Sequence, residues 1–399
     1  MAGTDRAAAA GRPGAARKSA STNVTRLADG GTDHKPARRA GQMDFSLFIA
    51  VVVICAFGLV MVFSSSYYYA QDKGLDNGYY YLKNQAMFLA LGLALILIIS
   101  RIDYHKWEKL RVVALAGVLL LMLAVVFFGE ERNGATRWLN IFGVSFQPSE
   151  LAKFVLLLYM AAFMAKRPHL MSSFSRGLLP MLMIIAVMCG ILLLQKNMSM
   201  MVIVMLTGIV MLYLGGAQVK HLLLLAAIAV PILVVAVMSE DYRVSRVLMF
   251  VNPWDSNQEG AYQLRQSLLA LGSGGLFGQG LNFSRQKLLF LPYGESDFIF
   301  SIIGEELGFM GCLGVIAMYG FVVYRGVRVA MRCKDRFGSL MAAGITAILG
   351  IQAAVNIAVA TSSVPPTGQT LPFISAGGSS LVIFMCAMGI LLNISRNTE

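Results

Sequence analysis

Long apolar stretches recur through most of the chain and constrain its fold more than any other feature. About ten of them are long enough to cross a hydrocarbon core of roughly 30 Å. Only 14% of the 399 residues are charged and 57% are hydrophobic, whereas soluble domains carry about 25% charged residues. Lipid cannot satisfy backbone polar groups, so a spanning segment of this kind must be helical. The sequence therefore predicts an all-α, polytopic integral membrane protein with about ten transmembrane helices.

The distribution of positive charge predicts the orientation of these spans. With the N-terminus placed in the cytoplasm, the cytoplasmic segments carry 22 of the 33 Lys and Arg residues, as the positive-inside rule requires. Both termini are therefore predicted to be cytoplasmic. The predicted spans are 45–64, 83–100, 112–128, 151–165, 178–195, 199–215, 221–238, 298–324, 339–360 and 379–394.

Two segments lie outside this pattern of spans. Residues 1–43 are rich in Ala, Gly, Thr and Arg and are predicted to form a disordered basic cytoplasmic tail, before a membrane domain over 44–395. The first apolar run begins at Phe45 and is interpreted as a signal anchor rather than a cleaved signal peptide. The net charge of +12 then comes from the tail and the cytoplasmic loops, so nucleic acid is not an expected partner.

The predicted extracytoplasmic loop 239–297 is too long to be a simple connector, and such loops are usually functional. Within it, Leu264, Leu268 and Leu271 are spaced to form one apolar face of a short amphipathic helix, expected to lie at the membrane surface. The stretch 272–282, GSGGLFGQGLN, is predicted to turn tightly. It lacks the GxxxxGK[ST] pattern, so a nucleotide site is not expected.

The predicted outer face has no histidine, because His34, His105, His169 and His221 all fall on the cytoplasmic side. Acid–base chemistry outside would therefore depend on carboxylates. Asp297 stands at the boundary of an apolar run, where it could serve as a base or simply as the N-cap of a helix. Glu295 is expected to be better solvated than Asp297, because it lies further from this boundary.

Four other charged residues occur in or at the start of apolar runs. Glu150 and Lys153 are three residues apart, which places them on one helical face, where a buried ion pair could be structural or functional. Glu305 and Glu306 are expected to have structural or gating roles, shielded from lipid by helices that approach at neighbouring glycines. The five cysteines form no CxxC pair, which indicates small apolar packing residues rather than a metal site or disulfides.

Four motifs, in order, resemble the SEDS family of peptidoglycan glycosyltransferases, of the FtsW, RodA and SpoVE type. They are NGATRWLNIFGVSFQPSELAK (133–153), YRVSRVLMFVNPW with AYQLRQSLLALGSGGLFGQGL (242–254 and 261–281), DFIFSIIGEELG (297–308) and PPTGQTLPFISAGGSS (365–380). The resemblance covers nearly all of the chain except the tail. It implies a bacterial cell-membrane enzyme that polymerises lipid II into glycan strands by inverting transfer and releases undecaprenyl diphosphate.

The resemblance also implies roles for individual residues. Asp297 corresponds to the essential aspartate and is predicted to be the general base, and Glu150 with Lys153 corresponds to an ion pair beside the central cavity. The residues predicted to bind the pyrophosphate or the sugars are Arg137, Lys196, Arg243, Arg246, Gln263 and Ser375.

The chain departs from the family pattern at three places, one of which is SAGG at 375–378, where the family usually has SYGG. In LPYGES, Tyr293 and Glu295 stand where the family usually has Glu and His. In QKNMS, Lys196 and Asn197 replace the usual Pro and Asp. These changes affect the expected positioning of the substrate and leave Asp297 in place.

The expected partner is a class B penicillin-binding protein, because the chain has no SxxK, SDN and KTG set for cross-linking. Division machinery is favoured over elongation or sporulation machinery by the TLPFISAGGSS stretch and the long tail. No cofactor is certain; a divalent cation, Mg²⁺ or Mn²⁺, could assist the pyrophosphate, but no ligand set for it is readable. The alternative function is a flippase for a lipid-linked precursor. A flippase should carry its key charges near the bilayer midplane, whereas here the polar features concentrate in the outer loops.

Overall fold

A computed structural model describes residues 41–74, 78–132, 135–141, 144–239, 244, 248–254 and 259–398. The helices are α1 (Phe45–Asp72), α2 (Tyr80–Ile99), α3 (His105–Phe128), α4 (Pro148–Lys166), η2 (Pro168–Leu170), η3 (Phe174–Leu178), α5 (Leu179–Leu194), α6 (Met198–Leu214), α7 (Val219–Met238), α9 (Glu259–Ser273), α10 (Ile299–Arg332), α11 (Arg336–Ala360) and α12 (Gly378–Ser395). The strands are β1 (Glu130–Arg132), β2 (Ala135–Ile141) and β3 (Val144–Phe146).

The predicted polytopic helical architecture is confirmed. Within the described residues, 8 helices are long and apolar enough to cross a membrane, and the shorter apolar helices Met198–Leu214 and Val219–Ile232 stand at the positions of two further predicted spans. Every predicted span corresponds to a helix, but α1 and α10 extend well beyond their predicted ends. The predicted spans ended where polar residues such as Ser64–Ser66 and Arg325 interrupt the apolar runs, but the helices continue through them. Ser64 and Arg325 form hydrogen bonds to the acidic side chains of Glu306 and Asp44.

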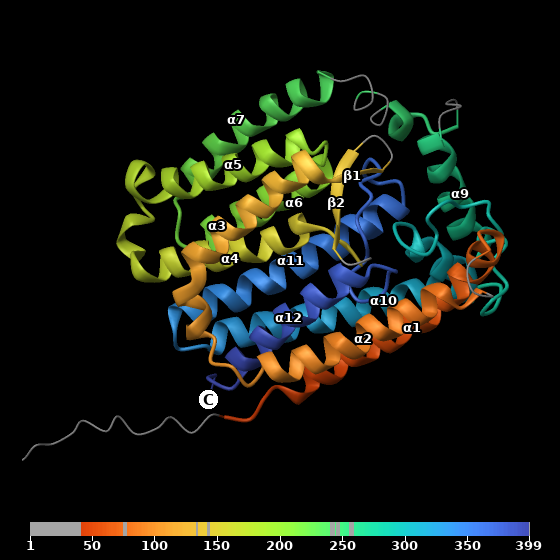
Figure 1. Ribbon diagram of the computed structural model, residues 1–399, viewed down its shortest axis with the longest axis horizontal. Helices are drawn as coiled ribbons and strands as arrows, with labels where there is room; N and C mark the ends of the chain where they lie inside the picture. The colour runs from red at the N-terminus through yellow and green to blue at the C-terminus, as the bar shows by residue number, and fades with distance from the viewer. Residues whose placement is uncertain are drawn as a thin grey trace, which may run out of the picture. The chain divides into compact units, whose positions relative to one another are not determined.

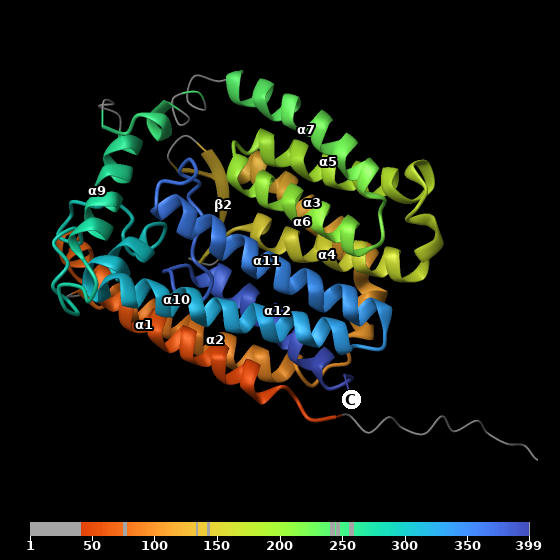
Figure 2. The same cartoon turned by 180° about the vertical axis from the view of Figure 1, so that it is seen from behind.

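Helix α11 lies at the centre of the bundle, where it contacts α4, α6, α10 and α12 (Figure 2). Around it, α1 and α2 pack with α10 and α12, and α3 packs on α4 (Figure 1). The sheet and α9 lie at the end of the bundle away from the C-terminus (Figure 1). Side chains at this end can therefore converge from several helices and loops.

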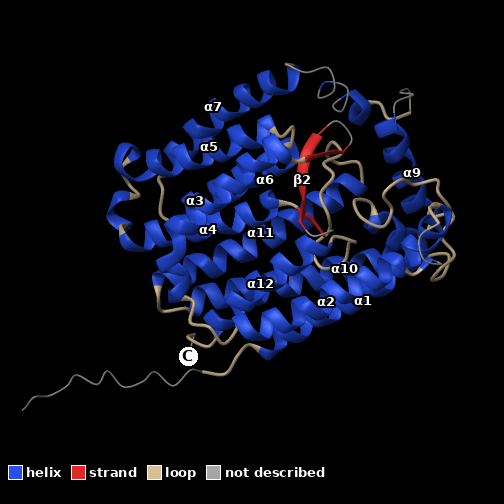
Figure 3. Cartoon of the chain, viewed as in Figure 1, coloured by secondary structure: helices blue, strands red, loops and turns tan. Residues whose placement is uncertain are grey.

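A small antiparallel sheet precedes α4 and was not predicted (Figure 3). Strand β2 pairs with β1 on one side and with β3 on the other, where Leu139 lies opposite Phe146. The sequence did contain a signal for it. An Asn133-Gly134 pair, which favours hairpins, stands among β-formers such as Thr136 and Trp138.

The apolar stripe predicted around Leu264 does form one face of a helix, α9, but that face packs on α10 and α11. The expectation that it lies at a membrane surface is wrong for this face. Ser267 on the same helix is buried and bonds to the Ser301 hydroxyl, at 2.6 Å, and to the Ala360 carbonyl, at 2.7 Å. Helix α9 is therefore fixed to α10 and α11.

Helix α10 is interrupted at Gly308, whose φ of 69° no other residue type adopts easily. The loop after α9 bonds to the interruption from both sides. The amide of Gln279 donates to the Glu305 carbonyl at 2.9 Å, and the amide of Phe309 donates to the Gly275 carbonyl at 2.9 Å. The backbone groups released by the break are thus satisfied by a segment of the long loop.

This break explains how Glu305 and Glu306 are accommodated. The segment Phe309–Arg332 rises about 36 Å on its own, which already exceeds a hydrocarbon core of roughly 30 Å. The two glutamates precede that segment, so the outer part of α10 can stand beyond the hydrocarbon core.

Both glutamates also have full sets of partners in the long loop and in α1. Glu305 accepts hydrogen bonds from the Ser284 hydroxyl and from the amide of Arg285, at 2.9 Å. Glu306 forms an ion pair with Lys287 at 2.9 Å and accepts from Ser64 at 2.7 Å. The two carboxylates hold the loop onto α10, in line with the structural role expected for them.

We predict that Gly308→Ala destabilises the protein by roughly 1–3 kcal/mol or more, because a non-glycine residue is strained at this φ. A Cβ at Gly308 would also lie 2.3 Å from the Gly278 amide nitrogen, which is backbone and cannot rotate away. The measurement is thermal unfolding in detergent followed by intrinsic fluorescence. Gly314→Ala in the same helix is the control, since a Cβ there meets nothing within 4 Å. Equal melting temperatures for the two variants would contradict the prediction.

Candidate functional site

A cavity of about 890 Å³ opens at the end of the bundle that carries the sheet and α9. Its walls come from the start of α2, from β2 and β3, from the start of α4, from α9, from residues 293–298 and from the loop before α12. All four motifs singled out in the sequence contribute residues to these walls. The fold therefore brings stretches far apart in the chain to one site.

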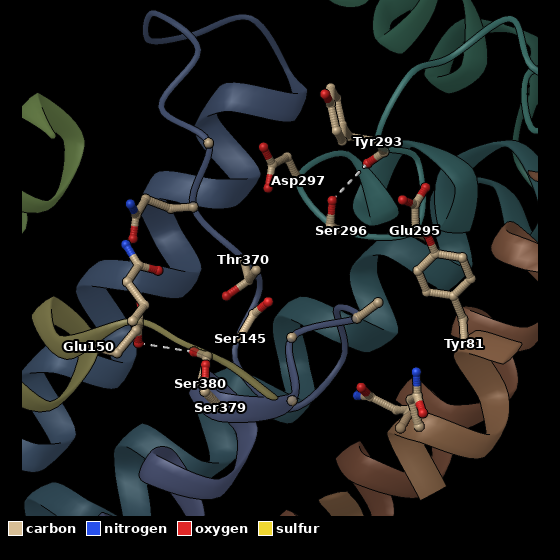
Figure 4. A pocket seen from close by; sticks show the side chains of 18 of the residues that line it. Tyr81, Ser145, Glu150, Tyr293, Glu295, Ser296, Asp297, Thr370, Ser379 and Ser380 are labelled. Atoms are coloured by element: carbon tan, nitrogen blue, oxygen red, sulfur yellow. Dashed lines mark hydrogen bonds between the residues drawn. The ribbon is translucent and has the colours of Figure 1, made fainter. Parts of the chain in front are cut away.

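Three carboxylates line this cavity: Glu150, Glu295 and Asp297 (Figure 4). Among the described lining residues Arg137 is the only cation, and no histidine is present. Neither Glu305 nor Glu306 lines the cavity. The site is thus acidic and depends on carboxyl groups for any proton transfer.

The Glu150–Lys153 pair forms at the base of the cavity. The Lys153 ammonium lies 2.8 Å from Glu150 Oε2, and both side chains are buried. Lys153 also donates to Gln352 on α11, and Ser380 at the start of α12 donates to Glu150 at 3.0 Å. The pair consequently joins three helices below the cavity floor.

The segment that carries Asp297 is held by its backbone. The amide of Asn356 on α11 donates to the Asp297 carbonyl at 2.9 Å and to the Gln369 carbonyl at 2.6 Å. Ser375 donates to the Ser296 carbonyl at 2.5 Å. These bonds join the 293–298 segment to the loop before α12, so both walls keep a fixed relation to α11.

The N-cap position of α10 falls one residue after Asp297. Helix α10 begins at Ile299, and its N-cap residue Phe298 makes no side-chain capping hydrogen bond. Asp297 is partly exposed, on the cavity side of the segment. Its side chain is therefore reachable from the cavity.

The expectation that Glu295 is better solvated than Asp297 is wrong. Glu295 is only 6% exposed, because the turn before α10 folds it under the loop that precedes α12. Burial, with a smaller contribution from the negative charge of Asp297, raises the pKa of Glu295 to about 7. Sequence distance from the apolar run was therefore a poor guide to solvation.

The structure gathers some of the other predicted binding residues and not the rest. Arg137 and Gln263 line the cavity, whereas Lys196 and Ser375 do not. Lys196 is exposed, and its carbonyl accepts a hydrogen bond from Arg137 at 2.7 Å. Ser375 is buried, and its hydroxyl accepts a hydrogen bond from the amide of Leu371. Arg243 and Arg246 lie outside the described residues.

Several cavity residues were not predicted from the sequence. Tyr80, Tyr81, Asn84 and Gln85 come from the start of α2, which lies outside the four motifs. A cluster of tyrosines and amides at the end of an apolar run was the available signal, since such side chains commonly sit at membrane interfaces and bind polar ligands.

Comparison with known proteins places the chain among membrane proteins of one family. A family model described as cell cycle protein, for FtsW, RodA and SpoVE, matches residues 45–399. The probable peptidoglycan glycosyltransferase FtsW of Geobacter metallireducens is 42% identical over 358 residues, which cover 89% of this chain and 95% of that protein. Stage V sporulation protein E of Bacillus subtilis is 37% identical over 356 residues, covering 88% and 97%.

Solved structures show the same architecture. The crystal structure of the rod shape determining protein RodA of Thermus thermophilus matches with a TM-score of 0.64 and 29% identity, over 89% of this chain and 97% of that one. A chain from a structure on the coordination of polymerization and crosslinking by a peptidoglycan synthase complex matches with a TM-score of 0.74 and 29% identity, over 89% and 98%. The similarity covers the helices and loops that build the cavity.

We predict that Glu150→Gln destabilises the protein by roughly 3–5 kcal/mol, because it leaves the buried Lys153 ammonium without a counter-charge. The double variant Glu150→Gln with Lys153→Met should recover part of the loss. Thermal unfolding in detergent is the measurement.

A matched control is the more exposed pair of Glu108 and Lys166, which lie 3.1 Å apart with side chains that are 17% and 54% exposed. Glu108→Gln should cost at most about 1 kcal/mol, as expected for a surface ion pair. Identical melting of wild type, Glu150→Gln and Lys153→Met would contradict the prediction.

Proposed function

We propose that this chain, which belongs to the family of cell cycle proteins that includes FtsW, RodA and SpoVE, is a peptidoglycan glycosyltransferase. Its proposed reaction is the polymerisation of lipid II. The observation that carries the proposal is the cavity in which Asp297, Glu150 and Arg137 meet at one end of the bundle. Relatives named as probable peptidoglycan glycosyltransferases align over most of the chain, which supports this assignment.

The proposed reaction joins two lipid-linked glycans. The acceptor's 4-hydroxyl attacks C1 of the donor sugar, the bond from C1 to the pyrophosphate oxygen breaks, and undecaprenyl diphosphate leaves. A single in-line displacement inverts the configuration at C1. Such a step requires a base for the hydroxyl proton and positive charge or hydrogen-bond donors for the leaving group.

Asp297 is proposed as the general base. Its side chain lines the cavity and is partly exposed, so an acceptor hydroxyl can reach it. Its backbone is fixed by Asn356, which limits the movement of the carboxylate during the transfer. Glu150 is held in the ion pair with Lys153 and is less suited to accept a proton.

The leaving pyrophosphate is proposed to bind near Arg137, with Arg243 and Arg246 completing the positive charge as the family resemblance implies. The described residues contain no group of three or more His, Cys, Asp or Glu side chains arranged to hold a metal ion. No step is assigned to a divalent cation.

The protein is proposed to act at the outer face of the bacterial cell membrane with a class B penicillin-binding protein as transpeptidase. The fold match to a chain of a peptidoglycan synthase complex supports a partner of this kind. The relatives named FtsW favour a place in the division machinery. The chain itself has no SxxK, SDN and KTG set for cross-linking.

We expect Asp297→Asn to lower the rate of lipid II polymerisation by about 10²–10⁴-fold, because the amide keeps the size of the side chain and removes the base. The measurement is the formation of glycan ladders from labelled lipid II by the purified full chain. Melting temperature and recovery of the partner should stay at wild-type values.

Asp72→Asn is the control, since Asp72 is an exposed carboxylate at the end of α1 and does not line the cavity. Near wild-type polymerisation by Asp297→Asn would show that the base is another residue. Movement of lipid II across vesicles without any ladder from the wild type would favour the flippase instead.

We also expect a cysteine at position 252 to react with an impermeant maleimide in spheroplasts, because Asn252 is exposed and lies in the loop proposed to be outside. A cysteine at position 109, on the opposite side in this topology, should react only after lysis. The reverse pattern would overturn the orientation and place the cavity in the cytoplasm.

A further inference from the structure

Glu295 is a cavity residue to which the proposed reaction gives no role. Its side chain is 6% exposed and lines the cavity two residues before the proposed base. Its carbonyl accepts from the amide of Ala376 at 2.9 Å, which fixes the turn against the loop before α12. Figure 4 shows its carboxyl group beside the ring of Tyr81.

Among the residues that the structure describes, the groups around Glu295 supply no positive charge. Those that interact with it electrostatically are Asp297 on its own segment, Tyr69 on α1 and Tyr81 on α2. Arg137 on β2 lines the same cavity but forms no ion pair with Glu295, and within the described residues no cation lies within 4.0 Å of it.

A buried carboxylate without a cation is costly, and the cost disappears when the group is neutral. Accordingly, the pKa of Glu295 is raised to about 7, first by burial and then by the charge of Asp297. The arrival of a pyrophosphate would raise this pKa further, because it adds negative charge to the cavity.

We propose that Glu295 is a hydrogen-bond donor to the substrate. Its carboxyl group is neutral, and its O–H donates to an oxygen of the leaving pyrophosphate. The proposal rests on the proposed function and extends it to a residue that the family pattern does not supply, since a histidine usually stands here. Glu295 gives up no proton in this step: its O–H stays in place while Asp297 takes the acceptor's proton, the C1–oxygen bond breaks and negative charge builds up on the pyrophosphate. A donor to a charged oxygen stabilises that charge more strongly than a neutral pair would.

The proposal predicts a polymerisation rate that falls as the pH rises. Glu295 carries the donor below its pKa and loses it as the pH rises through about 7. The polymerisation rate of the wild type should therefore fall by up to about tenfold for each pH unit above that value. Glu295→Gln keeps an N–H donor at every pH, so its rate should stay level from pH 6.5 to 8.5 and exceed that of the wild type at pH 8.5.

Glu295→Leu removes the donor and should lower the rate at pH 6.5 by about 10–100-fold, as expected for a lost hydrogen bond to a charged group. The melting temperatures of both variants show whether each has folded. A wild-type profile as level as that of Glu295→Gln, or a wild-type rate for Glu295→Leu at pH 6.5, would overturn the proposal.

A second measurement separates this proposal from the proposed function. Infrared difference spectra of the purified full chain should contain the carbonyl band of a protonated carboxyl group that disappears as the pH rises through about 7 and is missing in Glu295→Gln. Added undecaprenyl diphosphate should move the loss of that band to higher pH. An unchanged midpoint would overturn contact with the pyrophosphate, whether or not the protein polymerises lipid II. A moved midpoint in a protein that forms no glycan would instead contradict the polymerase assignment alone.

Discussion

The buried ammonium of Lys153 is the constraint on which the centre of the molecule depends. The side chain is fully buried on α4, in the middle of a bundle made mostly of apolar side chains. Such a charge is tolerated only when its partners are fixed, because desolvation costs several kcal/mol per ion. Glu150 supplies the counter-charge, Gln352 supplies an oxygen, and the ring of Phe384 lies 4.6 Å away. Helices α4, α11 and α12 must therefore meet in one arrangement, which also places the cavity floor.

The interrupted helix α10 solves a different problem at the same end of the bundle. A helix of 34 residues is longer than a membrane crossing requires, and its outer part carries two adjacent acids. Gly308 allows the backbone of the long loop to enter the break, and the two acids then bind loop residues. The long loop is thus tied to the framework, so the segment that leads to Asp297 starts from a fixed point.

The sequence was a good guide to the helices and a weaker guide to the surroundings of each site residue. Apolar length predicts a span well because the hydrocarbon core imposes it, and all the predicted spans correspond to helices. The helical spacing of Glu150 and Lys153 likewise placed them on one face, where the structure joins them. The burial of Glu295 was not predictable, because it depends on a loop about eighty residues later in the chain. The sheet before α4 was missed because β1 and β3 have only three residues each, too few to show an alternating pattern.

Amide side chains, rather than charged ones, hold the walls of the cavity in place. Gln85 donates to the Ser375 carbonyl at 3.1 Å, Gln352 donates to the Thr370 carbonyl at 3.1 Å, and Asn356 bonds to the carbonyl of the segment that carries the proposed base. Amides do not titrate in the range in which proteins fold. These amide contacts are therefore insensitive to acidity, and a shift in pH can change the charge inside the cavity while these wall contacts stay the same.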